Sequence, residues 1–401
     1  MNGFNLSDIQ DAKLGGTQLS AIYLGSSQLW PTDLQINEYL WFEIPNTGAI
    51  YFELAGSMSD ITIEYSLDKT NWTSITLSTS GTTSTHVNVF SDEKLYIRGN
   101  NSKYATSGSN YFHFRCPNNT IVGGNIMSLI YGDNFKGQTT LSSTYAFNSL
   151  FKSAGSLMSI SNLRLPATSI PNYAYQNMFS GNTSINDMIP EIPATYIGYY
   201  GCAGMFQACT SLDAVPDLST VTRVNGYAFA NMFSNCSALT VLPDFHNVAQ
   251  IDYWAPWRYT FSGCTSLVDA RWNVNGTRLL PDHLTVTSGG SAYEQMFQGC
   301  TALRYAPELT DKNPHAGEFN NMFNGCTNSR FTDIYTHGSS LGTNYYVDIV
   351  KNTGHAGNIW KAADVSWDSS QYSQFNYSGS GSTASRWPVY AANYNSGDYQ
   401  T

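Results

Sequence analysis

The chain has 401 residues, and only 12% of them are charged, against about 25% in a typical globular protein. The net charge of −10 argues against a nucleic-acid binder, because neutralising phosphates requires a basic surface. Aromatic residues make up 14% of the chain and the wider apolar set 42%, which excludes a disordered chain. The length allows several domains, each with its own core.

Residues 1–32 contain a short repeat that predicts an attachment segment. LGGTQL at 14–19 recurs as LGSSQL at 24–29, and the intervening SAIY alternates as strands do. The stretch resembles amino-terminal segments of virion proteins from phages of gut bacteria, which implies a role in attachment or assembly. The candidate attachment residues are Leu14, Leu19, Tyr23, Leu24, Leu29 and Trp30. The alternative is an ordinary β-hairpin that packs on the next domain.

The first thirteen residues lack the features of a secretory signal. They contain Asp8 and Asp11, have no basic start and include no apolar run. The chain also lacks a stretch of about 20 apolar residues, so no membrane span is predicted. Either the natural start has been trimmed, or the protein leaves its cell by lysis or another route.

Residues 33–118 predict an all-β domain. Turn residues separate the runs, and about seven short strands with this spacing are typical of a small β-sandwich. Such a module is expected to be a spacer or a carbohydrate-binding unit. The alternating runs lie at 39–44, 49–54, 61–66, 72–77, 86–90, 94–98 and 110–115.

Residues 119–337 contain about seven repeats of 26–36 residues, each marked by a phenylalanine. A Met usually precedes this residue, and a Cys usually follows three positions after it. An aromatic residue stands four positions before it in every repeat but one, in which Cys202 takes that place. The cysteine column predicts a ladder of small buried thiols. The marking residues are Phe151, Phe179, Phe206, Phe233, Phe261, Phe297 and Phe323.

The pattern within one repeat predicts a short helix followed by an extended segment. Phe229 and Phe233 stand at i and i+4, so YAFANMF at 227–233 is expected to be helical. Pro243 in the following ALTVLPDF forbids continuation of the helix. One unit cannot bury its own apolar face, but stacked units can, and this predicts a solenoid with a continuous core.

The repeat motif resembles a known family. MFSNCSALTVLPDF at 232–245, with MFQACTSLDAVPDL at 205–218 and MFQGCTALRYAPEL at 296–309, is similar to the BspA-like bacterial surface leucine-rich repeats. This family is common in gut bacteria and in their phages. The resemblance implies a leucine-rich-repeat solenoid with a role in adhesion or surface display, and it does not imply an enzyme.

The fold class expected from these parts is multidomain and mainly β with short helices: a β-sandwich followed by the solenoid. Residues 338–401 are expected to form a carboxyl-terminal cap and a Ser/Tyr/Gly-rich tail. SGSGSTAS at 378–385 predicts a flexible link. Trp360, Trp367 and Trp387 indicate that parts of this region dock onto other surfaces.

Catalytic and metal-binding motifs are absent from the sequence, so we expect no cofactor, no metal site and no catalytic residue. Gly338–Gly342 fits GxSxG, but the strand and helix of a nucleophile elbow are not predicted around it. A glycosidase needs two carboxylates across a cleft, whereas the repeat carboxylates are expected at a solvated edge. Those carboxylates are Asp213, Asp217, Asp244, Asp269 and Glu308.

Aromatic residues outside the repeat columns are the candidate ligand or interface contacts, because aromatic faces stack on sugars and anchor protein interfaces. Plain packing is the alternative for each of them. Trp272 lies where the repeat pattern breaks, beside an insertion near 274–291, and insertions in solenoids often map to the binding face. The candidates are Tyr196, Tyr199, Tyr200, Tyr253, Trp254 and Trp272.

The sequence thus predicts a non-enzymatic surface protein of a bacteriophage particle, such as a fibre, decoration or receptor-binding protein. Its expected partners are other virion proteins, through residues 1–32, and a host-surface glycan or protein; a homotrimer is expected by analogy with fibres. It would be assembled in the host cytoplasm, with no nucleic acid and no membrane insertion. A bacterial cell-surface leucine-rich-repeat adhesin is the second hypothesis, and a polysaccharide-degrading phage spike enzyme is the third.

Overall fold

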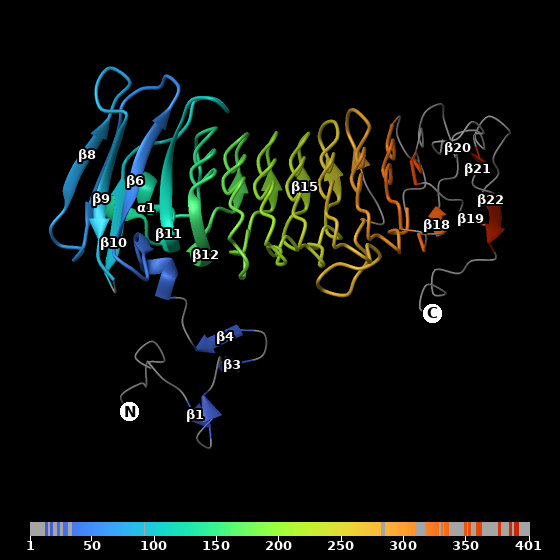
Figure 1. Cartoon of the computed structure of the whole chain (residues 1–401), viewed down its shortest axis with the longest axis horizontal. Helices are drawn as coiled ribbons and strands as arrows, with labels where there is room; N and C mark the ends of the chain where they lie inside the picture. Colours follow the sequence, from blue (N-terminus) through green and yellow to red (C-terminus); the bar gives the residue numbers. More distant parts are fainter. Residues whose placement is uncertain are drawn as a thin grey trace.

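The computed structural model is mainly β and has several sheets (Figure 1). Helical structure in the described residues is limited to the four-residue α1 (Ser128–Tyr131) and the short 3-10 helices η2 (Leu34–Asn37) and η3 (Gly132–Asn134). No described helix has the length and apolar character needed to cross a membrane. The structure describes residues 13–14, 17–18, 22–24, 27–30, 34–91, 93–281, 285–309, 317–328, 330–331, 333–336, 349–350, 352–353, 358–362, 376–377, 385–386 and 389–392.

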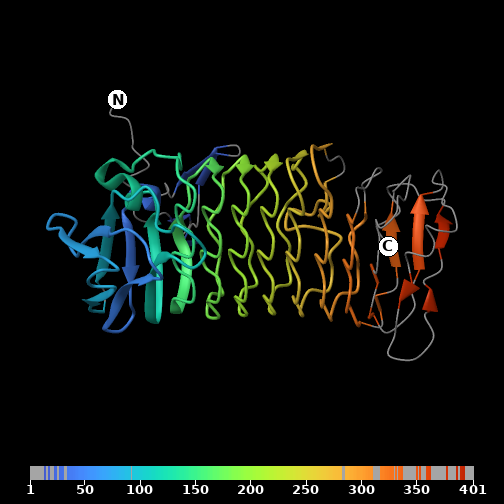
Figure 2. The same cartoon turned by 90° about the horizontal axis from the view of Figure 1, so that it is seen from above.

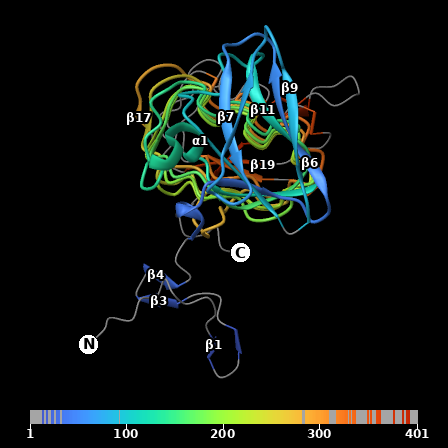
Figure 3. The same ribbon diagram turned by 90° about the vertical axis from the view of Figure 1, so that its left-hand side faces the viewer.

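Two antiparallel hairpins lie at the amino-terminal end, away from the main body of the protein (Figures 1 and 3). β1 (Lys13–Leu14) pairs with β2 (Thr17–Gln18), and β3 (Ile22–Leu24) pairs with β4 (Ser27–Trp30). The two copies of the short sequence repeat therefore form two successive hairpins. Five of the six candidate attachment residues lie on these strands, and Leu19 lies outside the described residues.

An eight-stranded sheet forms one end of the main body (Figure 1). Its strands run in the order β8-β7-β10-β5-β11-β6-β9, with β12 paired to β11, and each of the seven predicted runs overlaps one strand. A single hydrogen-bonded path links seven of these strands in a nearly closed sheet, and β12 joins the sheet through β11. The strands are β5 (Leu40–Glu43), β6 (Gly48–Ala55), β7 (Ile61–Ser66), β8 (Thr73–Leu77), β9 (Ser84–Val89), β10 (Lys94–Gly99), β11 (Tyr111–Asn125) and β12 (Gly155–Arg164).

Strand β11 joins this sheet to the repeats. It continues past the predicted boundary at residue 118, and its two halves pair with β6 and β5, while β12 runs parallel to it. The ring of Phe114 on β11 stacks on Phe151, the first marking phenylalanine, at 5.5 Å between centroids. The buried side chains of the sheet and the repeats therefore form one continuous hydrophobic cluster.

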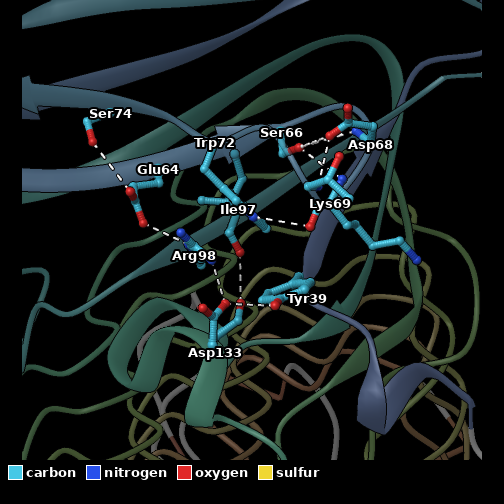
Figure 4. Close-up of polar contacts among 12 residues, drawn as sticks. Tyr39, Glu64, Ser66, Asp68, Lys69, Trp72, Ser74, Ile97, Arg98 and Asp133 are labelled. Carbon is cyan, nitrogen blue, oxygen red and sulfur yellow. Dashed lines mark hydrogen bonds and ion pairs between the residues drawn. The ribbon is translucent and has the colours of Figure 1, made fainter.

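A polar cluster fixes η3 against the sheet (Figure 4). The guanidinium of Arg98 binds Glu64 at 2.7 Å and Asp133 at 2.5 Å, and it lies 4.1 Å from the ring centroid of Trp72. The Tyr39 hydroxyl donates to the same Asp133 carboxylate at 2.8 Å. These bonds lower the pKa of the Asp133 carboxyl group, first through Tyr39 and then through Arg98.

The repeats form a stack of coils between residues 139 and 328, here called the coil stack (Figure 2). Five of its coils each contribute one two-residue strand to a parallel sheet in the order β13-β14-β15-β16-β17. Each of these strands buries its second residue or leaves it half-buried, and turns its first residue outward. The strands are β13 (Ser169–Ile170), β14 (Tyr196–Ile197), β15 (Arg223–Val224), β16 (Gln250–Ile251) and β17 (Thr285–Val286).

The short helix predicted at 227–233 was wrong: the segment is a run of turns, and the other coils repeat it. The backbone N–H groups alternate between two kinds of acceptor. One donates to the carbonyl three residues earlier, as Ala230 does to Tyr227, and the next donates to a carbonyl of the following coil, as Phe229 does to Pro256. Every fourth residue is left-handed, which a right-handed helix does not allow. In this coil those residues are Tyr227, Asn231 and Asn235, with φ of 55°, 57° and 62°.

The core of the coil stack consists of columns in register. The marking phenylalanines stack ring on ring, with centroids 5.4–5.8 Å apart from Phe151 to Phe323. The predicted ladder of buried thiols is confirmed, since all seven cysteines are free and buried. Burial raises the pKa of these thiols, that of Cys209 to about 12, so they are neutral hydrogen-bond donors.

Parallel pairing continues beyond the repeats. β18 (Asp333–Thr336), β19 (Asn358–Ala362) and β22 (Val389–Ala392) form a parallel sheet, and β20 (Asn376–Tyr377) pairs with β21 (Ser385–Arg386). Trp360 contacts β18: its Nε1 donates to Asp333 at 2.7 Å and its ring stacks on Tyr335. Trp367, Trp387, the GxSxG match and residues 378–384 of the predicted link lie outside the described residues.

Candidate functional site

Four tyrosines from successive coils stack into a ladder on the surface. Their ring centroids are 4.6, 5.6 and 4.7 Å apart, and neighbouring ring planes lie within 15° of parallel. Each ladder residue stands six positions before its marking phenylalanine and has a positive φ. The tyrosine ladder consists of Tyr145, Tyr173, Tyr200 and Tyr227.

Backbone hydrogen bonds keep the ladder in register. The N–H of each ladder tyrosine donates to a carbonyl of the next coil: Tyr173 to Tyr199 at 2.9 Å, Tyr200 to Gly226 at 3.1 Å, and Tyr227 to Trp254 at 3.0 Å. The ring spacing therefore follows the spacing of the coils. These hydrogen bonds hold the tyrosine side chains in fixed positions. Side chains that are already ordered lose less conformational entropy when a ligand binds.

Tyr199 lies across the ladder. Its ring plane is 81° from that of Tyr200, 84° from that of Tyr173 and 86° from that of Tyr227. Both faces of Tyr200 are already covered by Tyr173 and Tyr227, so Tyr199 meets the edge of Tyr200. This edge-to-face contact fixes the half-buried Tyr199 ring against the ladder.

Tyr253 and Trp254 extend this surface, and each packs over a glycine that leaves room for its ring; we call these two positions the glycine seats. A Cβ on Gly226 would lie 3.0 Å from Cδ1 of Tyr253, and one on Gly289 would lie 2.6 Å from Cδ1 of Trp254. Both aromatic side chains are 44% exposed, and the Tyr253 ring is 6.3 Å from that of Tyr199. We call Tyr199, Tyr253 and Trp254 the aromatic platform.

Polar side chains flank the platform on the adjacent strands. The guanidinium of Arg223 binds both carboxylate oxygens of Asp252, each at 2.9 Å, and lies 5.4 Å from the ring centroid of Tyr196. Gln250 donates to Asp252 at 2.7 Å, and Asn225 donates to the Tyr196 hydroxyl at 3.3 Å. We call this group the polar flank; it offers planar donors and acceptors beside the aromatic faces.

Burial and the neighbouring phenols raise the pKa of Tyr173, Tyr199 and Tyr200. Desolvation is the main cause for Tyr200, followed by the neighbouring phenols, and its pKa rises to about 12. The pKa values of Tyr173 and Tyr199 also rise, first through desolvation. These hydroxyls are therefore neutral near pH 7 and can both donate and accept hydrogen bonds.

The structure brings four of the six predicted contact residues together, and Tyr196 lies on the polar flank beside them. Trp272 lies instead beside the insertion, and it forms an isolated bridge with Arg278 of the insertion. The insertion folds back on the preceding coil, because Asn273 and Asn275 donate to the Asp244 carboxylate at 2.8 and 2.9 Å. The insertion thus completes a polar network rather than the aromatic platform.

The other repeat carboxylates are dispersed along the coil stack. Asp269 binds Arg271 at 2.8 Å, and the buried Glu308 binds Arg278 at 3.0 Å. Asp213 and Asp217 are exposed, and Asp217 accepts the N–H of Ser219 at 2.8 Å. In the part of the chain that the structure describes, no group of three or more His, Cys, Asp or Glu residues is arranged to hold a metal ion.

Sequence reasoning missed three ladder residues, Tyr145, Tyr173 and Tyr227, and the glycine seats. The signal was present, because a tyrosine precedes the marking phenylalanine by six residues in four successive repeats. Comparisons of the chain with protein-family models, with curated proteins and with solved structures found no match.

Proposed function

We propose that this chain is a non-enzymatic surface protein of a bacteriophage particle, of the fibre, decoration or receptor-binding type, and that it binds a host-surface glycan through the aromatic platform. The observation that carries the proposal is the pre-positioned set of the exposed Tyr253 and Trp254 and the half-buried Tyr199 beside a polar flank. Aromatic faces with an adjacent hydrogen-bonding group suit sugar rings, which have apolar faces and hydroxyl edges.

The finer architecture belongs to the same proposal. The coil stack would be a leucine-rich-repeat solenoid of the BspA-like type, which its stacked columns and parallel two-residue strands support. The eight-stranded sheet would be a sandwich-like spacer at the end of the solenoid. Its ion pairs support the spacer role, because Arg98 and Asp133 are engaged with each other and with neighbouring strands.

The amino-terminal hairpins would attach the protein to the virion. They extend away from the main body (Figure 1), so they could pair with another virion protein without disturbing the coil stack. Gold labelling of this protein on purified particles would test membership of the virion. Label on the particle is expected; label on the bacterial envelope alone would favour the adhesin hypothesis instead.

Binding to host cells tests the glycan assignment. We expect the purified chain to bind host cells that have been treated with protease. We expect it not to bind host cells whose surface sugars have been oxidised with periodate. The double variant Tyr253→Ala, Trp254→Ala should lose binding. Phe90→Ala should not, although it removes a 57% exposed ring next to the end of β9, far along the chain from the platform. Protease-sensitive, periodate-resistant binding would assign a protein receptor, and release of new reducing ends would favour the spike enzyme.

A further inference from the structure

We infer that the aromatic platform selects an uncharged, linear oligosaccharide that lies along the axis of the coil stack. This inference rests on the proposed function and specifies its ligand. It draws on three observations: the direction in which the platform extends, the pairing of two arginines with carboxylates, and the hydrogen-bonding groups of the polar flank.

The platform extends along the stack rather than across one coil. Tyr199 precedes Tyr200 of one coil, Tyr253 lies over Gly226 of the next, and Trp254 lies over Gly289 of a coil further on. The contact surface therefore spans successive coils that are held in parallel register. A linear chain of several sugar rings can contact all three aromatic side chains at once, whereas a monosaccharide cannot.

Two arginines that lie beside the tyrosines of this surface, Arg223 and Arg258, are each paired with a carboxylate. Arg223 uses Nε and Nη2 to bind Asp252, and Arg258 binds Glu294 at 3.2 Å. An anionic ligand would have to compete with these carboxylates and would approach a protein of net charge −10. An uncharged glycan carries neither cost, so the electrostatics favour neutral over acidic chains.

The polar flank supplies hydrogen bonds that suit neutral hydroxyls. The side chain of Arg223 is 53% exposed although it pairs with Asp252, so the ion pair presents donors and acceptors together to solvent. Adjacent hydroxyls of a sugar ring can each donate and accept, and planar guanidinium and carboxylate groups match such pairs. Tyr196 and Gln250 add a hydroxyl and an amide to the same edge.

Direct titration with defined probes tests this inference. The neutral probes are the linear hexasaccharides cello-, xylo-, manno- and maltohexaose, together with glucose. The two acidic probes are hexagalacturonate and a sulfated derivative of one of these hexasaccharides. We expect at least one neutral hexamer to bind more tightly than both acidic probes and glucose by about tenfold or more, with little dependence on salt, because no counterion is released. Trp254→Ala should weaken that binding about tenfold or more, and Phe90→Ala should not change it.

The outcomes separate the two proposals. Platform-dependent, salt-sensitive binding of an acidic probe in preference to every neutral hexamer would overturn the inference and leave the glycan-binding function standing. Equal affinity for glucose and the hexamers would overturn the linear, axial mode. If no probe binds and periodate-treated cells still bind the chain, both the inference and the proposed function fail. Arg223→Gln should weaken binding of the neutral hexamer, and an unchanged affinity would show that the polar flank is not part of the binding site.

Discussion

The thiol of Cys236 donates a hydrogen bond to the carbonyl oxygen of Phe206, one coil earlier, at 3.0 Å. The same carbonyl also accepts the N–H of Cys209 in its own coil, at 3.1 Å. The thiol ladder therefore does more than fill space, because each cysteine sets the spacing between two neighbouring coils. Equivalent thiol bonds of 3.1–3.2 Å are made by Cys209, Cys264, Cys300 and Cys326.

Loss of one such thiol should lower stability measurably. Cys236→Ala removes the bond between coils and leaves a small void, so we expect a loss of about 1–2 kcal/mol in the free energy of unfolding. Asn182 replaces the thiol in an earlier coil and makes bonds to Phe151, Phe179 and Ala154. Asn182→Ala should therefore cost more, about 2–3 kcal/mol.

Urea denaturation measures both changes. The control is Thr240→Ala, an exposed position in the extended segment of the same coil as Cys236. If Cys236→Ala were no more destabilising than Thr240→Ala, the thiol would contribute packing alone and the hydrogen-bond role would be rejected.

The left-handed positions predict a second set of effects. Asn231 has φ of 57°, a conformation that a β-branched side chain adopts at a cost of about 1–2 kcal/mol. Asn231→Val should destabilise by that amount, whereas Asn231→Gly should be close to neutral. Thermal unfolding checks the pair, with Thr240→Val as the matched control. Equal effects of Val and Gly at Asn231 would contradict the observed backbone conformation.

These positions also explain why the helix prediction failed. A run of four-residue turns brings i and i+4 onto one face, just as a helix of 3.6 residues per turn does, so Phe229 and Phe233 could not distinguish the two. The distinguishing signal is that most repeats have Asn, Gly or Ser two residues before and after the marking phenylalanine, as at Asn231 and Asn235. Those residue types tolerate a left-handed backbone better than most.

The core columns were predictable because stacking demands the same side-chain type in every repeat. The aromatic platform was predictable only in part. Tyr199 and Trp254 stood out as aromatics outside the columns, but the support of Tyr199 by the ladder depends on three-dimensional register. The seats at Gly226 and Gly289 depend on contacts between residues of different coils, which spacing along one chain does not reveal.

Two buried tyrosines should respond oppositely to loss of their hydroxyl groups. Within the described part of the chain, the buried Tyr175 hydroxyl has no hydrogen-bond partner, whereas that of Tyr104 donates to the carbonyl of Leu129 at 2.8 Å. Tyr175→Phe should be neutral or stabilising by up to about 1 kcal/mol, because an unpaired polar group leaves the core. Tyr104→Phe should destabilise by about 1–2 kcal/mol. Urea titration of both variants gives the comparison, and a larger loss for Tyr175→Phe would contradict the observed bonding.

The pairing of Asp133 predicts a pH dependence of stability. Its folded-state pKa lies below the ordinary value of about 3.9, so the pairing stabilises the fold above that pH and is lost as pH falls through the folded-state pKa. Because this side chain is 62% exposed, we expect Asp133→Asn to cost at most about 1 kcal/mol at pH 7. The difference from the parent protein should shrink as the pH falls below about 4. A difference that is constant over this range would show that the charge of Asp133 is not involved.

Tyr200 is predicted to position the platform without contacting the ligand itself. Its faces are covered by Tyr173 and Tyr227 and its edge meets Tyr199, so it acts by holding the Tyr199 ring in place. Tyr200→Phe preserves the ring and should leave affinity for a bound hexasaccharide within about twofold. Tyr200→Leu should weaken it about fivefold to tenfold, because the loss of an edge-to-face contact of about 1 kcal/mol frees the Tyr199 ring. Calorimetric titration measures the affinities. An unfolding curve for each variant shows whether the substitution lowers the stability of the whole protein or only releases the Tyr199 ring. Equal weakening by Phe and Leu would instead indicate a direct contact between the Tyr200 hydroxyl and the ligand.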